Sequence, residues 1–175
     1  MAISETIKKT IDGIRHQFPT EQALLIPLLH ELQATHGWIS PEQLKAAGEF
    51  LNLPLSKVRE VASFYTMFKL RPHGKVDVQI CTNISCWLNG ADKLVSCAER
   101  KLGIHCGETS ADGKFTLSQV ECLAACGTAP AMMINEDYHE SLTEAELEKI
   151  LDTTKKEIDS GKVPGKSTRK DGVWP

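Results

Sequence analysis

In the first seventy residues the apolar positions recur every three or four residues, the spacing that places side chains on one face of an α-helix. The first stripe consists of Ile3, Ile7, Ile11, Ile14 and Phe18. Pro19 ends this helix. A second helix is expected from Thr20 to the sequence THG at 35–37, with a kink at Pro27.

A third helix has a clearly marked start. Ser40 can act as the N-cap, a proline follows it, and Gln43 can complete a capping box. A fourth helix is expected over residues 56–68, and residues 69–75 form a linker. The pattern therefore predicts a helical bundle over residues 1–70, packed through the apolar faces of its helices.

Beyond the linker the pattern changes from a helical period to alternation. Residues 76–80 alternate between apolar and polar, which predicts a half-buried strand that ends at Cys81. A helix over residues 91–102 should follow, and then a second strand over KFTLSQVE at 114–121.

The last part of the chain predicts a hairpin and one more helix. The run AMMIN at 131–135 and the short run after ED suggest the hairpin, and Thr143 caps a helix that extends to about Ile158. Residues 71–158 should therefore form a second domain with a mixed sheet and flanking helices, which makes the whole chain α+β. Residues 159–175, rich in glycine, proline and lysine, are expected to be a flexible tail.

Composition and charge argue against several functional classes. Of the 175 residues, 41% are apolar and 25% are charged, which is typical of a globular protein. The formal charge of −3 and the lack of a basic stripe argue against a nucleic acid partner. No apolar stretch is long enough to cross a bilayer, and the N-terminus lacks the features of a secretion signal or transit peptide. We therefore expect a cytosolic protein without membrane insertion, or a mature form whose presequence is missing.

The six cysteines supply the candidate chemistry, because in a reducing compartment thiols are more often metal ligands or core residues than disulfides. Cys81 ends the first predicted strand and Cys122 ends the second. A strand, a helix and a strand in this order normally form a right-handed crossover with parallel strands, whose C-terminal ends lie at one edge of the sheet. Cys86 and Cys126 lie one short loop further on. We therefore expect four thiols to converge at that edge.

Four converging thiolates suit three kinds of occupant. Structural zinc accepts four thiolates, commonly from cysteine pairs separated by two to four residues. A [2Fe–2S] cluster also takes four thiolates, and its wider footprint tolerates longer loops. A pair of disulfides is the third option, which the reducing compartment disfavours. The residues alone favour the cluster but leave zinc open, because soft thiolates suit both.

Two motifs contain the four cysteines: C-T-x-x-x-C-x-L-x-G at 81–90 and E-C-L-x-A-C-x-x-A-P at 121–130. Together they resemble the thioredoxin-like [2Fe–2S] ferredoxin family. Three further segments resemble the same family: GWIS at 37–40, EVASFYTMF at 60–68 and GETSADGKFTL at 107–117. The resemblance covers nearly the whole chain except the tail, and Ala124 departs from it because many relatives carry glycine there.

The resemblance implies a fold, a set of ligands and a function. The fold is a helical bundle followed by a thioredoxin-like mixed sheet, and the implied ligands of the cluster are Cys81, Cys86, Cys122 and Cys126. The implied function is electron transfer, as a small subunit in the peripheral arm of respiratory NADH:quinone oxidoreductase (complex I), at the cytoplasmic face of the inner membrane. The equivalent subunit of a NAD-linked hydrogenase or formate dehydrogenase is an alternative.

A [2Fe–2S] cluster passes one electron at a time, whereas NADH delivers two together, and flavin is the usual cofactor that separates the pair. The chain has no G-x-G-x-x-G after a strand and no other nucleotide-binding motif. It should therefore need a flavoprotein partner, and the resemblance implies one that binds FMN and NADH. The alternative from another class is a zinc-stabilised interaction module without redox activity.

Other residues near the motifs have two interpretations each. Cys97 and Cys106 are expected to be structural core residues, although Cys106 is also a candidate substitute ligand. Glu121 either favours the oxidised cluster through its charge or is a solvated strand residue. Trp87 either contacts a partner or shields the cluster from water.

Pro130, Trp174 and the histidines each carry a separate expectation. A cis bond before Pro130 is possible but not expected, because cis occurs in only about one in twenty X–Pro bonds. Trp174 is either a second partner contact or disordered. The six histidines are scattered without metal-binding spacing.

Overall fold

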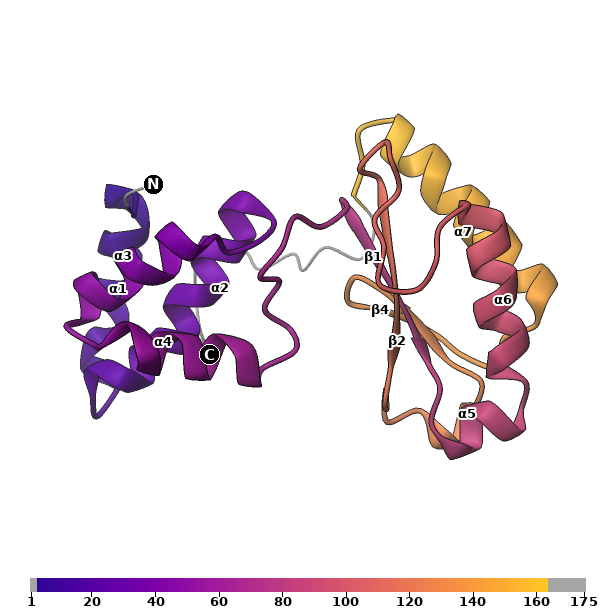
Figure 1. The fold of residues 1–175 in the computed structure, drawn as a ribbon, viewed down its shortest axis with the longest axis horizontal. Helices are drawn as coiled ribbons and strands as arrows, with labels where there is room; N and C mark the ends of the chain where they lie inside the picture. The colour runs from indigo at the N-terminus through magenta and orange to yellow at the C-terminus, as the bar shows by residue number, and fades with distance from the viewer. Residues whose placement is uncertain (1–2, 164–175) are drawn as a thin grey trace. The chain divides into compact units, whose positions relative to one another are not determined.

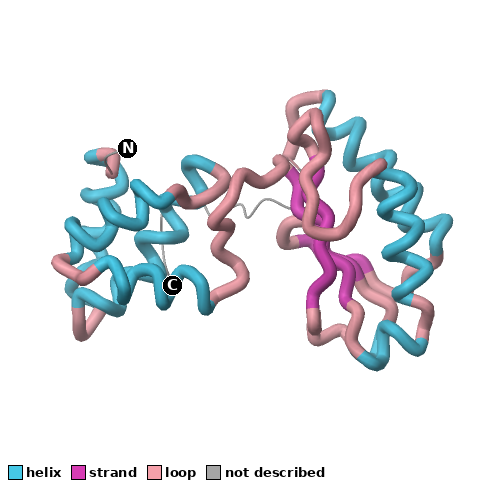
Figure 2. Tube along the Cα trace, viewed as in Figure 1, coloured by secondary structure: helices cyan, strands magenta, loops and turns pink. Residues whose placement is uncertain are grey.

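A computed structural model describes residues 3–163 of the chain and divides into two compact units. Unit 1 ends at Pro72 and unit 2 begins at His73. The described residues of unit 1 form helices and the turns between them, whereas unit 2 combines a mixed sheet with helices (Figures 1 and 2). The α+β fold class predicted from the sequence is therefore confirmed.

Unit 1 is a small helical bundle. Its helices are α1 (Glu5–Ile14), α2 (Leu25–His36), α3 (Pro41–Leu51) and α4 (Leu55–Phe64), with 3-10 turns at Arg15–Gln17 and Glu21–Leu24. The first stripe packs as predicted, because Ile3, Ile7 and Ile11 are buried in the core of the bundle. The predicted capping box is also present: Ser40 Oγ accepts the Gln43 backbone N–H at 3.3 Å, and Gln43 Oε1 accepts the Ser40 N–H at 2.8 Å.

The second and fourth helices differ from the sequence-based expectation. The expected helix from Thr20 begins as a 3-10 turn, and Pro27 lies in the first turn of α2, where the absence of an N–H is best tolerated. Helix α4 ends at Phe64 and not at the expected Phe68. Gln33 of α2 holds the chain beyond α4, donating to the Met67 carbonyl at 2.9 Å and accepting the Lys69 N–H at 2.6 Å.

Unit 2 contains a four-stranded sheet in the order β2-β1-β3-β4. The strands are β1 (Val76–Cys81), β2 (Phe115–Val120), β3 (Met132–Ile134) and β4 (Asp137–His139), and the helices are α5 (Ile84–Leu88), α6 (Ala91–Leu102) and α7 (Glu144–Asp159), with a 3-10 turn at Cys126–Thr128. Strand β1 pairs with β2 in parallel and with β3 antiparallel, and β3 and β4 form the predicted hairpin.

Helices α6 and α7 cover one face of the sheet (Figure 1). The strand residues that point to this face are buried with apolar residues of both helices, and they include Val76, Val78, Ile80, Phe115 and Leu117. No helix among residues 3–163 combines the length and hydropathy that a membrane crossing needs. Residues 164–175, which make up most of the expected tail and include Trp174, lie outside the described residues.

The expectation that β1 is half-buried is wrong. Strand β1 lies between two other strands, and Asp77 on the face opposite α6 and α7 is only 7% exposed. Its carboxylate accepts a hydrogen bond from Gln79 Nε2 at 2.7 Å and lies 3.3 Å from His73 Nε2. Side-chain partners thus allow a polar residue to be buried at a position where alternation alone indicated solvent.

Candidate metal centre

The parallel pairing of β1 with β2 brings the two cysteine motifs to the same end of the sheet. Cys81 is the last residue of β1 and lies opposite Val120, the last residue of β2. The Thr82 N–H continues the ladder to the Val120 carbonyl at 3.0 Å, and the Cys81 N–H donates to the Ala131 carbonyl at 3.1 Å. Strand β2 ends at Val120, two residues before the expected Cys122, and its end meets the end of β1 as the topology predicted.

Cys86 is held by a short helix that the sequence analysis missed, since a loop was expected there. Helix α5 begins after Asn83, whose Oδ1 accepts the Ile84 N–H at 2.7 Å. The helix turns the Cys86 side chain inward, where it is 2% exposed. An asparagine directly before an apolar run is a known N-cap signal, and it was the available indication of this helix.

A small buried cluster joins the two motifs. Cys81 and Cys86 pack with Leu123 from the second motif, and Ala91 and Ala131 complete the cluster. In Figures 1 and 2, α5 lies at one end of the sheet, beside the loop that follows β2. Residues about forty positions apart in the sequence therefore form one site.

The second motif presents its thiols differently from the first. Cys81 and Cys86 are buried, whereas Cys122 and Cys126 are exposed. Between the exposed pair, Ala124 has a positive φ of 59° and its N–H donates to Cys122 Sγ at 3.2 Å. Many members of the resembling family carry glycine at this position. The left-handed conformation explains that preference, because glycine alone adopts it without steric cost.

The pKa values of the first cysteine pair reflect thiols held close together. Burial raises the pKa of Cys86, and a hydrogen bond with Cys81 and the charges of Cys81 and Cys126 raise it further. Burial also acts to raise the pKa of Cys81, but the backbone N–H groups of Asn83 and Leu123 and the hydrogen bond with Cys86 outweigh it, so the net shift is downward. The charges of Cys81 and Cys126 thus disfavour ionisation of Cys86, and a cationic occupant would offset that effect.

Glu121 combines features of both of its sequence-based interpretations. Its side chain is exposed, and its carboxylate still lies close enough to act to raise the pKa of Cys81. Its backbone carbonyl is 3.9 Å from Cys81 Sγ. Glu121 is therefore a solvated residue whose charge reaches the site.

The other two cysteines belong to the main core of unit 2. Cys97 of α6 is 1% exposed, and Cys106 is partly buried against the same core. Burial raises the pKa of both thiols, and Cys97 Sγ lies 3.5 Å from Glu148 Oε1 on α7. The structure therefore places both in a cluster separate from the four motif cysteines.

All six cysteines are free thiols, and the bond before Pro130 is cis.

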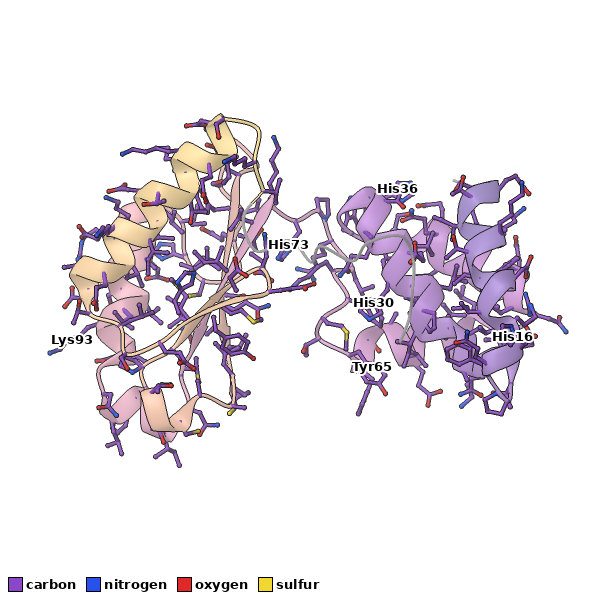
Figure 3. All side chains as sticks on the ribbon, turned by 180° about the vertical axis from the view of Figure 1, so that it is seen from behind. His16, His30, His36, Tyr65, His73 and Lys93 are labelled. Atoms are coloured by element: carbon purple, nitrogen blue, oxygen red, sulfur yellow. The ribbon has the colours of Figure 1, made fainter. Side chains whose placement is uncertain are left out.

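The histidines in the described part of each unit do not form a metal-binding group. His16, His30 and His36 lie on separate parts of unit 1, and His73 lies at the start of unit 2 (Figure 3). Within residues 3–163, no three Cys, His, Asp or Glu side chains surround a point where a single metal ion could bind. Two bridged irons need a different arrangement, because each takes only two of the four thiolates.

The sequence is similar to a described family over most of its length. A family model described as thioredoxin-like [2Fe-2S] ferredoxin matches residues 11–155. The E subunit of NADH-quinone oxidoreductase from Rickettsia prowazekii (strain Madrid E) is 41% identical over 153 residues, which cover 86% of this chain and 82% of that protein. The E 2 subunit of NADH-quinone oxidoreductase from Rhizobium meliloti (strain 1021) is 38% identical over 148 residues, which cover 85% and 88%.

Solved structures share the fold. A NAD+-reducing [NiFe]-hydrogenase in the air-oxidised state superposes with a TM-score of 0.68 at 20% identity. The match covers 80% of this chain but only 24% of the hydrogenase chain. At this identity the similarity supports the thioredoxin-like α+β architecture and nothing more specific.

Proposed function

Because the chain belongs to the thioredoxin-like [2Fe–2S] ferredoxin family, we propose that it carries its cluster beside the FMN of a partner subunit in a respiratory NADH:quinone oxidoreductase. Family membership itself makes the chain an electron-transfer protein with an iron–sulfur cluster. The names and high coverage of its relatives support membership of an NADH-oxidising complex.

The proposed ligands are Cys81, Cys86, Cys122 and Cys126, and the residues present suit that role. The four thiols are the soft donors that iron–sulfur clusters take. The Ala124 N–H donates to Cys122 Sγ at 3.2 Å, and the backbone at Asn83 and Leu123 lowers the pKa of Cys81. Such bonds stabilise the thiolate over the thiol and favour ligation. This convergence of two motifs on one buried cluster is the observation that carries the proposal.

A [2Fe–2S] cluster bound there supplies one-electron transfer. The chain's own residues set its surroundings: Leu123 and Ala131 exclude water on the buried side, while Cys122 and Cys126 leave the opposite side exposed. Glu121 adds negative charge near Cys81, which disfavours the more negative, reduced form. We place the donor on a separate subunit that binds FMN and NADH, because the sequence contains no nucleotide-binding motif.

The same proposal assigns the chain to the peripheral arm of the complex, at the cytoplasmic face of the inner membrane. Its main alternative is the equivalent subunit of a NAD-linked hydrogenase or formate dehydrogenase. The structural match to a hydrogenase, at 20% identity, shows a shared fold and does not favour this alternative, whereas relatives at 38–41% identity carry the NADH-quinone oxidoreductase name.

The test is rapid mixing of the anaerobic, oxidised pair of this chain and its flavoprotein partner with NADH. We expect the visible [2Fe–2S] band to bleach on NADH addition, and to bleach with dithionite in the isolated chain. A cluster that dithionite reduces but NADH never reduces in the assembled pair would refute the proposed place beside the flavin. A colourless chain containing zinc would instead support the zinc-stabilised interaction module.

A further inference from the structure

The two segments of unit 2 that carry the motif cysteines are depleted in charged side chains, although Glu121 borders the second segment. Residues 82–91 contain no Asp, Glu, Lys or Arg, and neither do residues 122–135, although a quarter of the whole chain is charged. Depletion of charged residues is the compositional mark of the central part of a protein–protein interface. Because these two segments carry no charged side chain, another protein can cover them at little cost in lost hydration.

Helix α5 adds large apolar side chains to the first of these segments. Ile84 is 71% exposed, Trp87 61% and Leu88 70%, and they are the three most exposed large apolar residues in the described part of unit 2. The same five-residue helix turns Cys86 inward, so one short element carries a proposed ligand on one side and this apolar face on the other. Clustered exposed apolar residues mark binding surfaces, and tryptophan is enriched among interface residues that dominate affinity.

We propose that the exposed side of α5, formed by Ile84, Trp87 and Leu88, is the surface on which a flavin-carrying subunit docks, with Trp87 as the anchor. This inference rests on the proposed function, because a flavin donor must approach the end of the sheet where the four thiols lie. Helix α5 lies at that end of the sheet, because its residue Cys86 packs against Leu123 of the second motif. A protein that covers this end therefore also covers α5. The 61% exposure of Trp87 favours the first of its two sequence-based interpretations, contact with a partner, over shielding of the cluster from water.

Surface substitutions test this assignment without disturbing the ligands. Trp87→Gln and Leu88→Gln remove apolar contact area from exposed positions and leave the inward face of α5 unchanged. Tyr138→Gln is the matched control, because Tyr138 is 54% exposed in the same unit but lies on strand β4 of the hairpin. The full-length, cluster-loaded chain is titrated into its flavoprotein subunit, and the dissociation constant is measured by calorimetry under anaerobic conditions.

We expect Trp87→Gln to weaken binding by about thirtyfold, the loss that defines an interface hot spot. Leu88→Gln should weaken binding by at least about threefold, and Tyr138→Gln by less than about twofold. The visible [2Fe–2S] spectrum should be unchanged in all three variants. Wild-type affinity in both α5 variants, with the cluster intact, would overturn the inference while leaving the proposed function standing.

Two further outcomes separate the possible failures. If the wild-type chain holds its cluster but shows no binding to the flavoprotein, the proposed function fails and the inference fails with it. If Trp87→Gln abolishes self-association of the chain in sedimentation but leaves flavoprotein binding unchanged, the surface belongs to a second copy of the chain, and the flavoprotein assignment is overturned.

Discussion

The left-handed backbone conformation of Ala124 predicts how a glycine at this position changes the free energy of unfolding. The sign and size of this change follow from the φ angle of Ala124. At a φ of 59°, the alanine Cβ is crowded against the following carbonyl, at a cost of about 1–2 kcal/mol that glycine does not have. Glycine in turn gives the unfolded chain extra freedom, which costs about 0.4–1 kcal/mol. Ala124→Gly should therefore raise the free energy of unfolding by about 0.8 kcal/mol.

The neighbouring residue supplies a matched control. Ala125 has a φ of −102° and a ψ of 41°, so its Cβ does not meet the crowding that a positive φ causes, and a glycine there does not relieve it. Ala125→Gly should lower the free energy of unfolding by about 0.4–1 kcal/mol. The assay is urea unfolding of the reduced, cluster-free chain followed by circular dichroism, with the midpoint compared at constant slope.

The two substitutions should thus shift the urea midpoint in opposite directions. If Ala124→Gly lowers the midpoint as much as Ala125→Gly does, the reasoning from φ is refuted. A third variant connects stability to the site, because the Ala124 N–H donates to Cys122 Sγ. Ala124→Val, a β-branched residue that tolerates positive φ poorly, should lose this bond and lower the yield of loaded cluster, whereas Ala124→Gly should preserve it.

Three further predictions concern other parts of unit 2. Leu123→Ala, which truncates a side chain that is 8% exposed, should destabilise the chain by about 2–4 kcal/mol in urea unfolding and reduce the iron retained on purification. Cys97→Ser combined with Cys106→Ser should leave the visible cluster spectrum intact, since both thiols lie in the other core cluster. The Thr143 hydroxyl and N–H lower the pKa of Glu146 in the folded chain. The ionised Glu146 therefore stabilises the fold above the pKa that it has in the unfolded chain. This stabilisation disappears as the pH falls through its lower folded-state pKa. Glu146→Gln, which keeps the cap, should therefore lose less stability than wild type between about pH 5 and pH 3 in urea titrations.

Each of these predictions has a distinct contrary outcome. Full iron retention in Leu123→Ala would show that the buried side chains packed beneath α5 do not support the iron–sulfur site. Loss of colour in the double serine variant would reassign the ligands. Equal acid sensitivity of Glu146→Gln and wild type would mean that this carboxylate does not contribute to the pH dependence of stability.

The sequence predicted the parts of the fold that depend on local patterns and on one topological rule. Ser40 and Gln43 form the expected capping box, and Thr143 caps the last helix as expected. The parallel pairing of β1 and β2 followed from the preferred handedness of crossovers, and it accounts for the meeting of Cys81 with the loop of Cys122. Short-range chemistry and chain topology were sufficient for these features.

Features set by distant contacts could not be predicted in this way. Helix α4 ends early where Gln33, more than thirty residues away in the sequence, binds the backbone at Met67 and Lys69. Asp77 is buried because Gln79 and Ser118 donate hydrogen bonds to its carboxylate, which alternation does not reveal. Helix α5 was missed for a different reason: a five-residue helix is too short to show a period, and only its N-cap marks it.

We propose that the four motif cysteines hold two bridged irons. Its most direct test is a quantified EPR spectrum of the anaerobically purified chain after dithionite reduction, recorded together with metal and sulfide analysis of the same sample. We expect one unpaired electron per chain, with two irons and two sulfides. A chain without a signal that contains one zinc ion and no sulfide would contradict it.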